Sequence, residues 1–181
     1  MERIIRLSLL AVAFLLTAFL IQAAIDAKVN YYNSKDKRSA DIASTTVETE
    51  RQLECLAINI YKEAGYEPFE GKVGVAQVTL NRVTSDKFPN DVCKVVYQKN
   101  KVMERVVCQF SWYCDRVHKT RAVDPTAYKE SYEVAKKVLL EDFKLDSLTE
   151  ALYYHADYVN PQWRKTKVGK FGVHIFYKDK A

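Results

Sequence analysis

Glu63 is the side chain best suited to chemistry in this chain of 181 residues. It stands in the run ECLAINIYKEAGYEPFEG, just before Gly65, at the end of an expected amphipathic helix. With a turn of about 100° per residue, its side chain falls about 20° from Leu56, on the margin of the apolar face. Burial raises the pKa of a carboxyl group and keeps its proton available near neutral pH. The sequence therefore predicts that Glu63 is a general acid.

Two other sets of side chains suit different chemistry. A cysteine nucleophile would pair Cys55 with His155 or His174, but Cys55 falls inside a helix, away from the N-terminal dipole that lowers a thiol pKa. A zinc site would use His155, Asp157 and His174, but no HExxH or comparable signature accompanies them. We expect no metal and no cofactor, and we expect His118 at the surface.

Apolar spacing predicts the long helices that must position these groups. The first begins near Thr45, where TTVE fits a capping box, and ends before Gly65. The second begins at Pro68, and the third covers residues 126–140 after an opening Asp-Pro pair. In the second helix, GKVG places two glycines where close packing against the first helix is expected.

Short elements complete a helix-dominated α+β domain with a small antiparallel sheet. A short helix is expected over residues 91–97. The aromatic runs ALYYH at 151–155 and HIFY at 174–177 predict strands. The domain is expected to cover residues 45–181.

Residues 1–25 differ from the rest of the chain. Arg3 and Arg6 precede an uncharged apolar run, residues 7–25. Basic residues before such a run indicate an export signal, and the run is long enough to span a bilayer. A cleaved signal peptide and an uncleaved signal-anchor both remain open, and a buried core helix is the third reading. The polar residues 26–44, with KDKR at 35–38, are expected to form a linker or stalk.

Four cysteines agree with an exported chain, in the periplasm or cell wall. An exported chain with this even number suggests up to two disulfides, with three possible pairings, although free buried thiols are an alternative. We favour Cys93 with Cys108, which would tie the segment after the second helix to the QFSW segment. The cysteines are Cys55, Cys93, Cys108 and Cys114.

Several segments occur in one continuous order between residues 50 and 178. They are IYKEA (60–64), EP with EG (67–71), VAQV and LNRV (75–83), FP (88–89), VC with VVYQ (92–98), CQFSW (108–112), YHA (154–156), PQW (161–163) and HIFY (174–177). This ordered set resembles the SleB type of cell wall hydrolase, the family of spore-cortex-lytic enzymes and related bacterial and phage lysins. Members commonly read GEARGE where this chain reads KEAGYE, so Glu63 aligns with the catalytic Glu and an Arg is missing beside it.

The resemblance implies a lysozyme-like fold that cuts the β-1,4 bond between N-acetylmuramic acid and N-acetylglucosamine in peptidoglycan. It also implies lytic transglycosylase chemistry, in which Glu63 protonates the glycosidic oxygen and then acts as base toward the sugar's own C6 hydroxyl. That route needs one carboxylate, whereas hydrolysis by a muramidase usually needs two. Glu67 and Glu70 equally suit a solvated first helical turn. Candidates for a second carboxylate are Glu67, Glu70, Asp115 and Asp157.

Further side chains suit contact with a glycan strand. Gln109 and Ser111 offer hydrogen bonds, and Phe110 offers a ring face, although Phe110 and Trp112 equally suit a core. Trp163 is expected in a loop, where an aromatic side chain suits binding. The expected substrate-binding residues are Gln109, Phe110, Ser111, Tyr154, His155, Trp163 and His174.

The expected partner is the peptidoglycan glycan strand. The net charge of +5 suits an anionic wall polymer, but it is too small and dispersed to indicate nucleic acid. We expect a monomer, with a membrane as a second partner if residues 7–25 are retained. A phage endolysin and a bacterial wall-remodelling enzyme both fit. The alternatives are a muramidase, a wall peptidase or amidase, and a non-enzymatic membrane-anchored binding module.

Overall fold

The computed structural model describes residues 1–180, except for the side chains of residues 4 and 11–13, and it divides into two compact units, Met1–Glu48 and Thr49–Ala181. The first unit is entirely helical and belongs to α1, Glu2–Ala64. Its described apolar side chains are exposed, as with Phe14 at 73% and Phe19 at 72%. The reading of residues 7–25 as a buried core helix is therefore wrong. By length and composition, α1 qualifies as a helix able to cross a membrane.

α1 does not begin at Thr45, so the predicted capping box is wrong. The Thr45 and Thr46 hydroxyls instead donate to the carbonyls of Asp41 and Ile42, one turn back, at 2.9 Å each. Residues 26–44 contain no Gly and no Pro, so nothing in their sequence breaks the helix. Their backbone is helical, and their assignment as a linker stays a prediction. The C-terminal end is as expected, since α1 ends at Ala64 and a Cβ on Gly65 would lie 2.5 Å from the Tyr61 carbonyl oxygen.

The second unit packs its helices around the last turns of α1. The face predicted from apolar spacing is fully buried there. The partners are α2 (Phe69–Val83), which begins after Pro68 as predicted, α3 (Val92–Val96) and α6 (Pro125–Leu140), whose N-cap Asp124 accepts from two backbone N–H groups. The main core includes Leu53, Leu56, Ala57, Ile60, Val73, Ala76, Val95, Val96, Ala135 and Val138.

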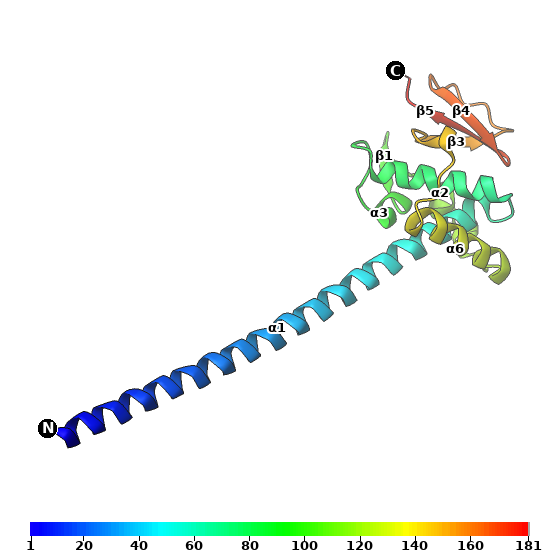
Figure 1. Cartoon of the computed structure of the whole chain (residues 1–181). Helices are drawn as coiled ribbons and strands as arrows, with labels where there is room; N and C mark the ends of the chain where they lie inside the picture. The colour runs from blue at the N-terminus through cyan, green and yellow to red at the C-terminus, as the bar shows by residue number, and fades with distance from the viewer. Residues whose placement is uncertain (181) are drawn as a thin grey trace. The chain divides into compact units, whose positions relative to one another are not determined.

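A three-stranded antiparallel sheet forms the C-terminal part of the second unit (Figure 1). The strand order is β3, β5, β4, and the central β5 pairs Phe176 with Tyr154. Phe176 also explains one helix glycine, because a Cβ on Gly74 would lie 2.4 Å from its ring. That glycine therefore serves contact with the sheet rather than with α1. The strands are β3 (Tyr153–Ala156), β4 (Thr166–Phe171) and β5 (His174–Lys178), of which β4 was not predicted. The helix-dominated α+β prediction is confirmed.

Several short elements between residues 99 and 148 escaped prediction. Each has five residues or fewer, which is too short for a periodic pattern to identify it. They are β1 (Lys99–Val102), β2 (Arg105–Cys108), α4 (Ser111–Cys114), α5 (Arg116–Thr120) and the 3-10 helix η1 (Asp146–Leu148).

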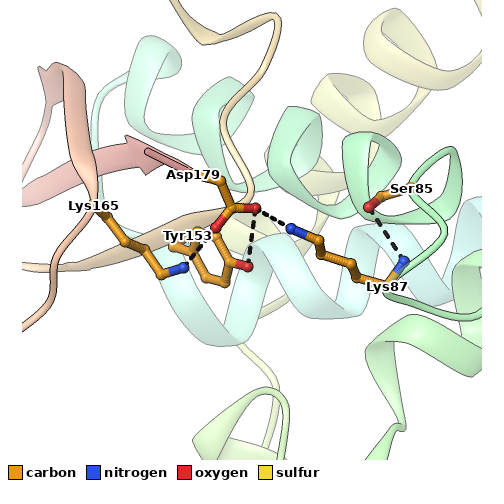
Figure 2. Close-up of polar contacts among 5 residues, drawn as sticks. All are labelled: Ser85, Lys87, Tyr153, Lys165 and Asp179. Atoms are coloured by element: carbon orange, nitrogen blue, oxygen red, sulfur yellow. Dashed lines mark hydrogen bonds and ion pairs between the residues drawn. The ribbon is translucent and has the colours of Figure 1, made fainter. Parts of the chain in front are cut away.

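Asp179, after the last strand, is held by side chains from distant segments (Figure 2). It accepts from Lys165 at 2.8 Å and from Lys87 at 2.7 Å, and the Tyr153 hydroxyl lies 3.4 Å away. Hydrogen bonds from Lys165 and then Lys87 lower the pKa of Asp179 to about 2. The network therefore fixes the end of β5 to β3, to the segment before β4 and to the loop after α2.

The preferred disulfide pairing, Cys93 with Cys108, is wrong. Cys55 of α1 bonds to Cys93 of α3, and Cys108 bonds to Cys114. The first bridge joins two helices that share the core, and the second closes a loop around the QFSW segment. Because Cys55 is in a disulfide, it has no thiol to act as a nucleophile.

The two bridges should differ in their effect on stability. Loop-closure entropy grows with the length of chain enclosed, and the bridges span 38 and 6 residues. Replacing Cys55 and Cys93 with Ala should therefore lower the free energy of unfolding by about 4 kcal/mol, against about 2 kcal/mol for Cys108 and Cys114. Denaturant unfolding of both double variants measures this. A larger loss from the short bridge would contradict it.

Candidate active site

A cleft of about 510 Å³ opens beside the end of α1 in the second unit. Its walls come from the ends of α1 and α2, from the segment 109–118, and from strands β3 and β5. Seven of the eight predicted site residues line it, and Trp163 does not. The lining residues are Lys62, Glu63, Arg82, Gln109, Phe110, Ser111, Trp112, Asp115, His118, Tyr154, His155, Ala156, Tyr158 and His174.

Glu63 lies in this cleft and is tied to the sheet by Tyr154. The Tyr154 hydroxyl donates to Oε2 of Glu63 at 2.9 Å. Tyr154 is itself fixed by ring contacts with His174 and Phe176, whose centroids lie 4.8 and 5.6 Å away. The carboxyl group of Glu63 is therefore oriented by a side chain from the other half of the unit.

The surroundings of Glu63 favour the protonated form of its carboxyl group. Burial raises the pKa of the carboxyl group above its usual value of about 4.5. The Tyr154 hydrogen bond and the Arg82 charge lower it in part, and the charge of Glu67 raises it again. Burial also raises the pKa of Tyr154 well above its usual range, so the phenol remains a donor. These are the conditions for a general acid near neutral pH.

Arg82 of α2 is a buried cation beside Glu63, and sequence reasoning gave it no role. The residue is 4% exposed, and its Nε donates to the Leu152 carbonyl at 2.9 Å. Its guanidinium carbon lies 5.2 Å from the ring centroid of Phe88 and 5.1 Å from that of Phe110. Its Nη1 is buried and has no hydrogen-bond partner among the residues described. Burial lowers the pKa of Arg82, although an arginine keeps its charge.

His174 and Glu67 meet behind the cleft. Nδ1 of His174 lies 2.8 Å from Oε1 of Glu67, but the contact lacks hydrogen-bond geometry. Burial lowers the pKa of His174 to about 4, so we describe the ring as neutral at neutral pH rather than as half of a salt bridge. Glu67 also accepts from the Val173 N–H at 3.0 Å. Gly172 is required at this point, because its φ is +58° and a Cβ there would lie 1.9 Å from the Glu67 carboxylate.

The QFSW segment contributes to both the core and the cleft. Phe110 and Trp112 belong to the main core, and the Trp112 Nε1 donates to Asn59 at 2.9 Å. The buried Phe110 ring is covered by the Arg82 guanidinium, so it does not offer a free face to a sugar. Gln109 and Ser111 are less buried and lie on the cleft wall. The segment thus offers polar groups rather than an aromatic platform.

His155 and Trp163 belong to an aromatic cluster next to the cleft. His155 stacks on Tyr177, with 5.2 Å between ring centroids, and its Nε2 lies 2.9 Å from the Tyr177 hydroxyl. Trp163 contacts His155 edge to face at 5.5 Å and is 44% exposed. Trp163 is therefore joined to the cleft through His155 rather than being part of its wall.

The candidates for a second carboxylate are engaged elsewhere or lie outside the cleft. Glu67 is held by β5 and its turn, Asp157 pairs with Lys170 at 2.8 Å, and Glu70 is exposed in the first turn of α2. Asp115 lines the cleft, but it caps α5 and binds His118 at 2.8 Å. Hydrogen bonds from His118 lower the pKa of Asp115, so it is a carboxylate. Among the described residues, no group of three or more His, Cys, Asp or Glu could hold a metal ion.

Two solved structures share this fold. The catalytic domain of the Bacillus cereus SleB protein has a TM-score of 0.52 and 29% identity, over 71% of this chain and 91% of that one. The catalytic domain of the Bacillus anthracis germination-specific lytic transglycosylase SleB has the same score and identity, over 70% and 93%. The second unit therefore has the fold of a SleB catalytic domain.

The family model described as Cell Wall Hydrolase matches residues 66–177, and the chain belongs to this family. The matched segment begins just after Glu63. The spore cortex-lytic enzymes of Bacillus cereus and Bacillus subtilis are 32% identical over 138 residues and 30% over 132 residues. These alignments cover 72% and 68% of this chain but 45% and 36% of the relatives. The chain thus spans less than half the length of these curated relatives.

Removing the Tyr154 hydroxyl should raise the pKa of Glu63 further. The hydrogen bond stabilises the carboxylate and so lowers the pKa. In Tyr154→Phe this bond is lost, and the upward effect of burial on the pKa is opposed by less. Titration of carbon-13-labelled glutamate carboxyls by NMR measures this, with the Glu63 signal assigned by its loss in Glu63→Gln. Tyr153→Phe, on the neighbouring position of β3, is the matched control and should leave the Glu63 titration in place. An unchanged or lowered pKa in Tyr154→Phe would refute this account of the site.

Proposed function

We propose that the second unit cleaves the β-1,4 bond between N-acetylmuramic acid and N-acetylglucosamine in peptidoglycan, as a lytic transglycosylase. The observation that carries the proposal is the buried carboxyl group of Glu63, which lies in the cleft, accepts a hydrogen bond from Tyr154 and has a raised pKa. The names of the relatives agree, since they are spore cortex-lytic enzymes and a germination-specific lytic transglycosylase. The remaining proposed contacts with the glycan come from Gln109, Ser111, His155 and His174.

Glu63 acts first as an acid. Tyr154 donates to Oε2, so the acidic proton is on Oε1. Oε1 gives this proton to the glycosidic oxygen as the bond from that oxygen to C1 of the muramyl residue breaks. The N-acetylglucosamine residue then leaves with a free hydroxyl, and positive charge develops at C1.

Glu63 acts next as a base. Its carboxylate, stabilised by Tyr154 and by the Arg82 charge, takes the proton from the C6 hydroxyl of the same muramyl residue. The C6 oxygen bonds to C1 and forms a 1,6-anhydro ring. Glu63 is then protonated again, and no water is consumed.

A hydrolytic muramidase is the alternative, and the residues of the cleft favour a lytic transglycosylase. Hydrolysis needs a second carboxylate to activate water or to attack C1. Within the described part of the cleft wall, Asp115 is the other carboxylate, and its oxygens are taken by His118 and the N-terminus of α5. A reaction whose nucleophile belongs to the substrate fits a site with one free acid.

Replacing Glu63 should remove cleavage without unfolding the domain. Glu63→Gln keeps the shape of the side chain but carries no acidic proton, so the rate should fall by about 100- to 10,000-fold. Release of soluble glycan from purified peptidoglycan measures the rate, and thermal unfolding checks the fold. Glu54→Gln, an exposed acid on the same helix, is the matched control. Cleavage by Glu63→Gln at the rate of the control would end the proposal.

The products separate the two chemistries. Digestion in oxygen-18 water should give muramyl ends in the 1,6-anhydro form, with no label, as read by mass spectrometry. Reducing muramyl ends carrying oxygen-18 would show that water is the nucleophile, and the enzyme would then be a muramidase. Intact glycan with shortened stem peptides would indicate a wall peptidase, and intact glycan with released stem peptides would indicate an amidase.

We also propose that residues 1–25 export the domain and remain as a signal-anchor, with residues 26–44 as a helical stalk and residues 45–181 as the wall-cleaving domain. The support is the run of exposed apolar side chains, which is unfavourable in water, and the helix that continues without a break. The domain would then act as a monomer on the wall side of the membrane.

Fractionation of producing cells tests the anchor. The full-length mass should be found in the membrane pellet after alkaline carbonate extraction. A chain that lacks residues 1–25 and appears in the soluble fraction would establish a cleaved signal peptide instead. Replacing two apolar residues of the run with charged ones, Leu15→Arg and Leu16→Arg, should release the chain from the pellet, because each charge at the centre of a bilayer costs about 3 kcal/mol.

A further inference from the structure

A second pocket of about 340 Å³ meets the cleft at the catalytic acid. The two hollows share three wall residues, Lys62, Glu63 and His118. The rest of the second pocket comes from the end of α1, the turn after it and the segment after α5. Its other lining residues are Tyr61, Ala64, Gly65, Tyr66, Glu67, Arg121 and Ala122. A ligand seated over Glu63 can therefore extend into both hollows.

The walls of the second pocket are held in place before any ligand binds. Lys62 Nζ donates to the carbonyl of His118 at 2.8 Å and to that of Arg121 at 3.4 Å. The Tyr61 hydroxyl accepts from the Asp124 N–H at 2.9 Å. These bonds join the end of α1 to the segment after α5. Because the two sides are linked, the pocket is part of the fold and not a gap between loose loops.

The second pocket adds a cation and two phenol rings to the Lys62 side chain that it shares with the main cleft. The added cation is Arg121, and the rings are those of Tyr61 and Tyr66. Within the described residues, Arg121 has no carboxylate at ion-pair distance, and two of the three N–H donors of Lys62 are used by carbonyls. The Glu67 carboxylate is engaged by the Val173 N–H, and burial favours the uncharged form of Glu63. The pocket therefore has donors for an anionic group.

We propose that the second pocket binds the carboxylate carried by the O3 arm of the muramyl residue, with Arg121 as its main partner. This inference rests on the proposed cleavage of peptidoglycan. The muramyl residue differs from its neighbour by a lactyl group at O3, which ends in a free carboxylate or continues into a stem peptide with carboxylates of its own. Sugar rings are uncharged, so the guanidinium of Arg121, close to the proposed catalytic acid, suits this arm better than a ring.

The position of the pocket gives it a part in specificity. Both hollows meet at Glu63, so a group in the second pocket belongs to a sugar next to the broken bond. Binding of the arm then selects which of the two alternating β-1,4 bonds lies over Glu63. The anhydro product requires that bond to follow a muramyl residue. Arg121 would thus set the register of the strand without taking part in proton transfer.

Three substrates and one variant test the proposal, using the full-length chain in detergent. The substrates are strands with intact stem peptides, strands stripped of peptides to leave the lactyl carboxylate, and stripped strands whose lactyl carboxylate is converted to a neutral methylamide. The wild type should cleave the charged strands with a kcat/KM about fivefold above that for the neutral strands, as for a partly exposed ion pair. In Arg121→Ala this ratio should fall to about one, and in Arg121→Lys it should be kept in large part.

The comparison of substrates identifies the source of the carboxylate. A preference for stripped over methylamide strands assigns the lactyl group, and a preference found only with intact strands assigns the stem peptide. Arg105→Ala, which removes an exposed cation of β2 outside both hollows, is the matched control and should keep the wild-type ratio.

Two results would overturn the inference. Equal rates of the wild type on all three substrates would show that the carboxylate is not bound. An equal loss by Arg121→Ala on all three would show that the pocket holds a neutral part of the glycan. In both cases cleavage itself continues, whereas failure of the wild type to cleave any of the three strands would reject the proposed function instead.

Discussion

The hydrogen bond from Tyr154 to Glu63 is the contact on which the site depends, because it joins two halves of the fold that come from distant parts of the chain. Glu63 ends the helix that forms the centre of the core, and Tyr154 lies on the strand next to β5. The ring of Tyr154 is held by Phe176, which in turn packs into the space left by Gly74 of α2. The packing of the sheet on α2 is therefore also what aims the acid.

The same contact opposes the effect of burial on the pKa of Glu63. Burial favours the protonated form, while Tyr154 and Arg82 favour the carboxylate. In the proposed reaction Glu63 gives away a proton and then takes one back, and both influences serve this cycle, since either alone would favour one charge state. Arg82 supplies its charge from a fixed place between two phenylalanine rings, so it does not move to neutralise the acid. Among the described residues, the groups that act on the pKa of Glu63 are thus a phenol, a guanidinium and the carboxylate of Glu67.

The local part of this arrangement could be predicted from the sequence, and the long-range part could not. Glu63 was found because one helical period places it beside the apolar face, and Tyr154 and His174 stood in short aromatic runs typical of strands. A charged residue in a helix, such as Arg82, is normally expected to face solvent. Its burial depends on the rings of Phe88 and Phe110, which come from other segments. Glu67 was expected either as a second carboxylate or as a solvated acid in a helical turn, whereas its partners are Val173 and His174, at the start of β5. The cysteine pairing failed for the same reason, since it depends on how α3 packs on α1.

The short bridge between Cys108 and Cys114 makes one wall of the cleft depend on the redox conditions around the protein. The bridge encloses Gln109 and Ser111, which line the cleft, together with Phe110 and Trp112, which belong to the main core. Two anchors therefore hold this wall: the core contacts of Phe110 and Trp112 fix its middle, and the disulfide joins its two ends. Disulfides persist in oxidising surroundings, so the second anchor is available to an exported chain and lost in a reducing compartment.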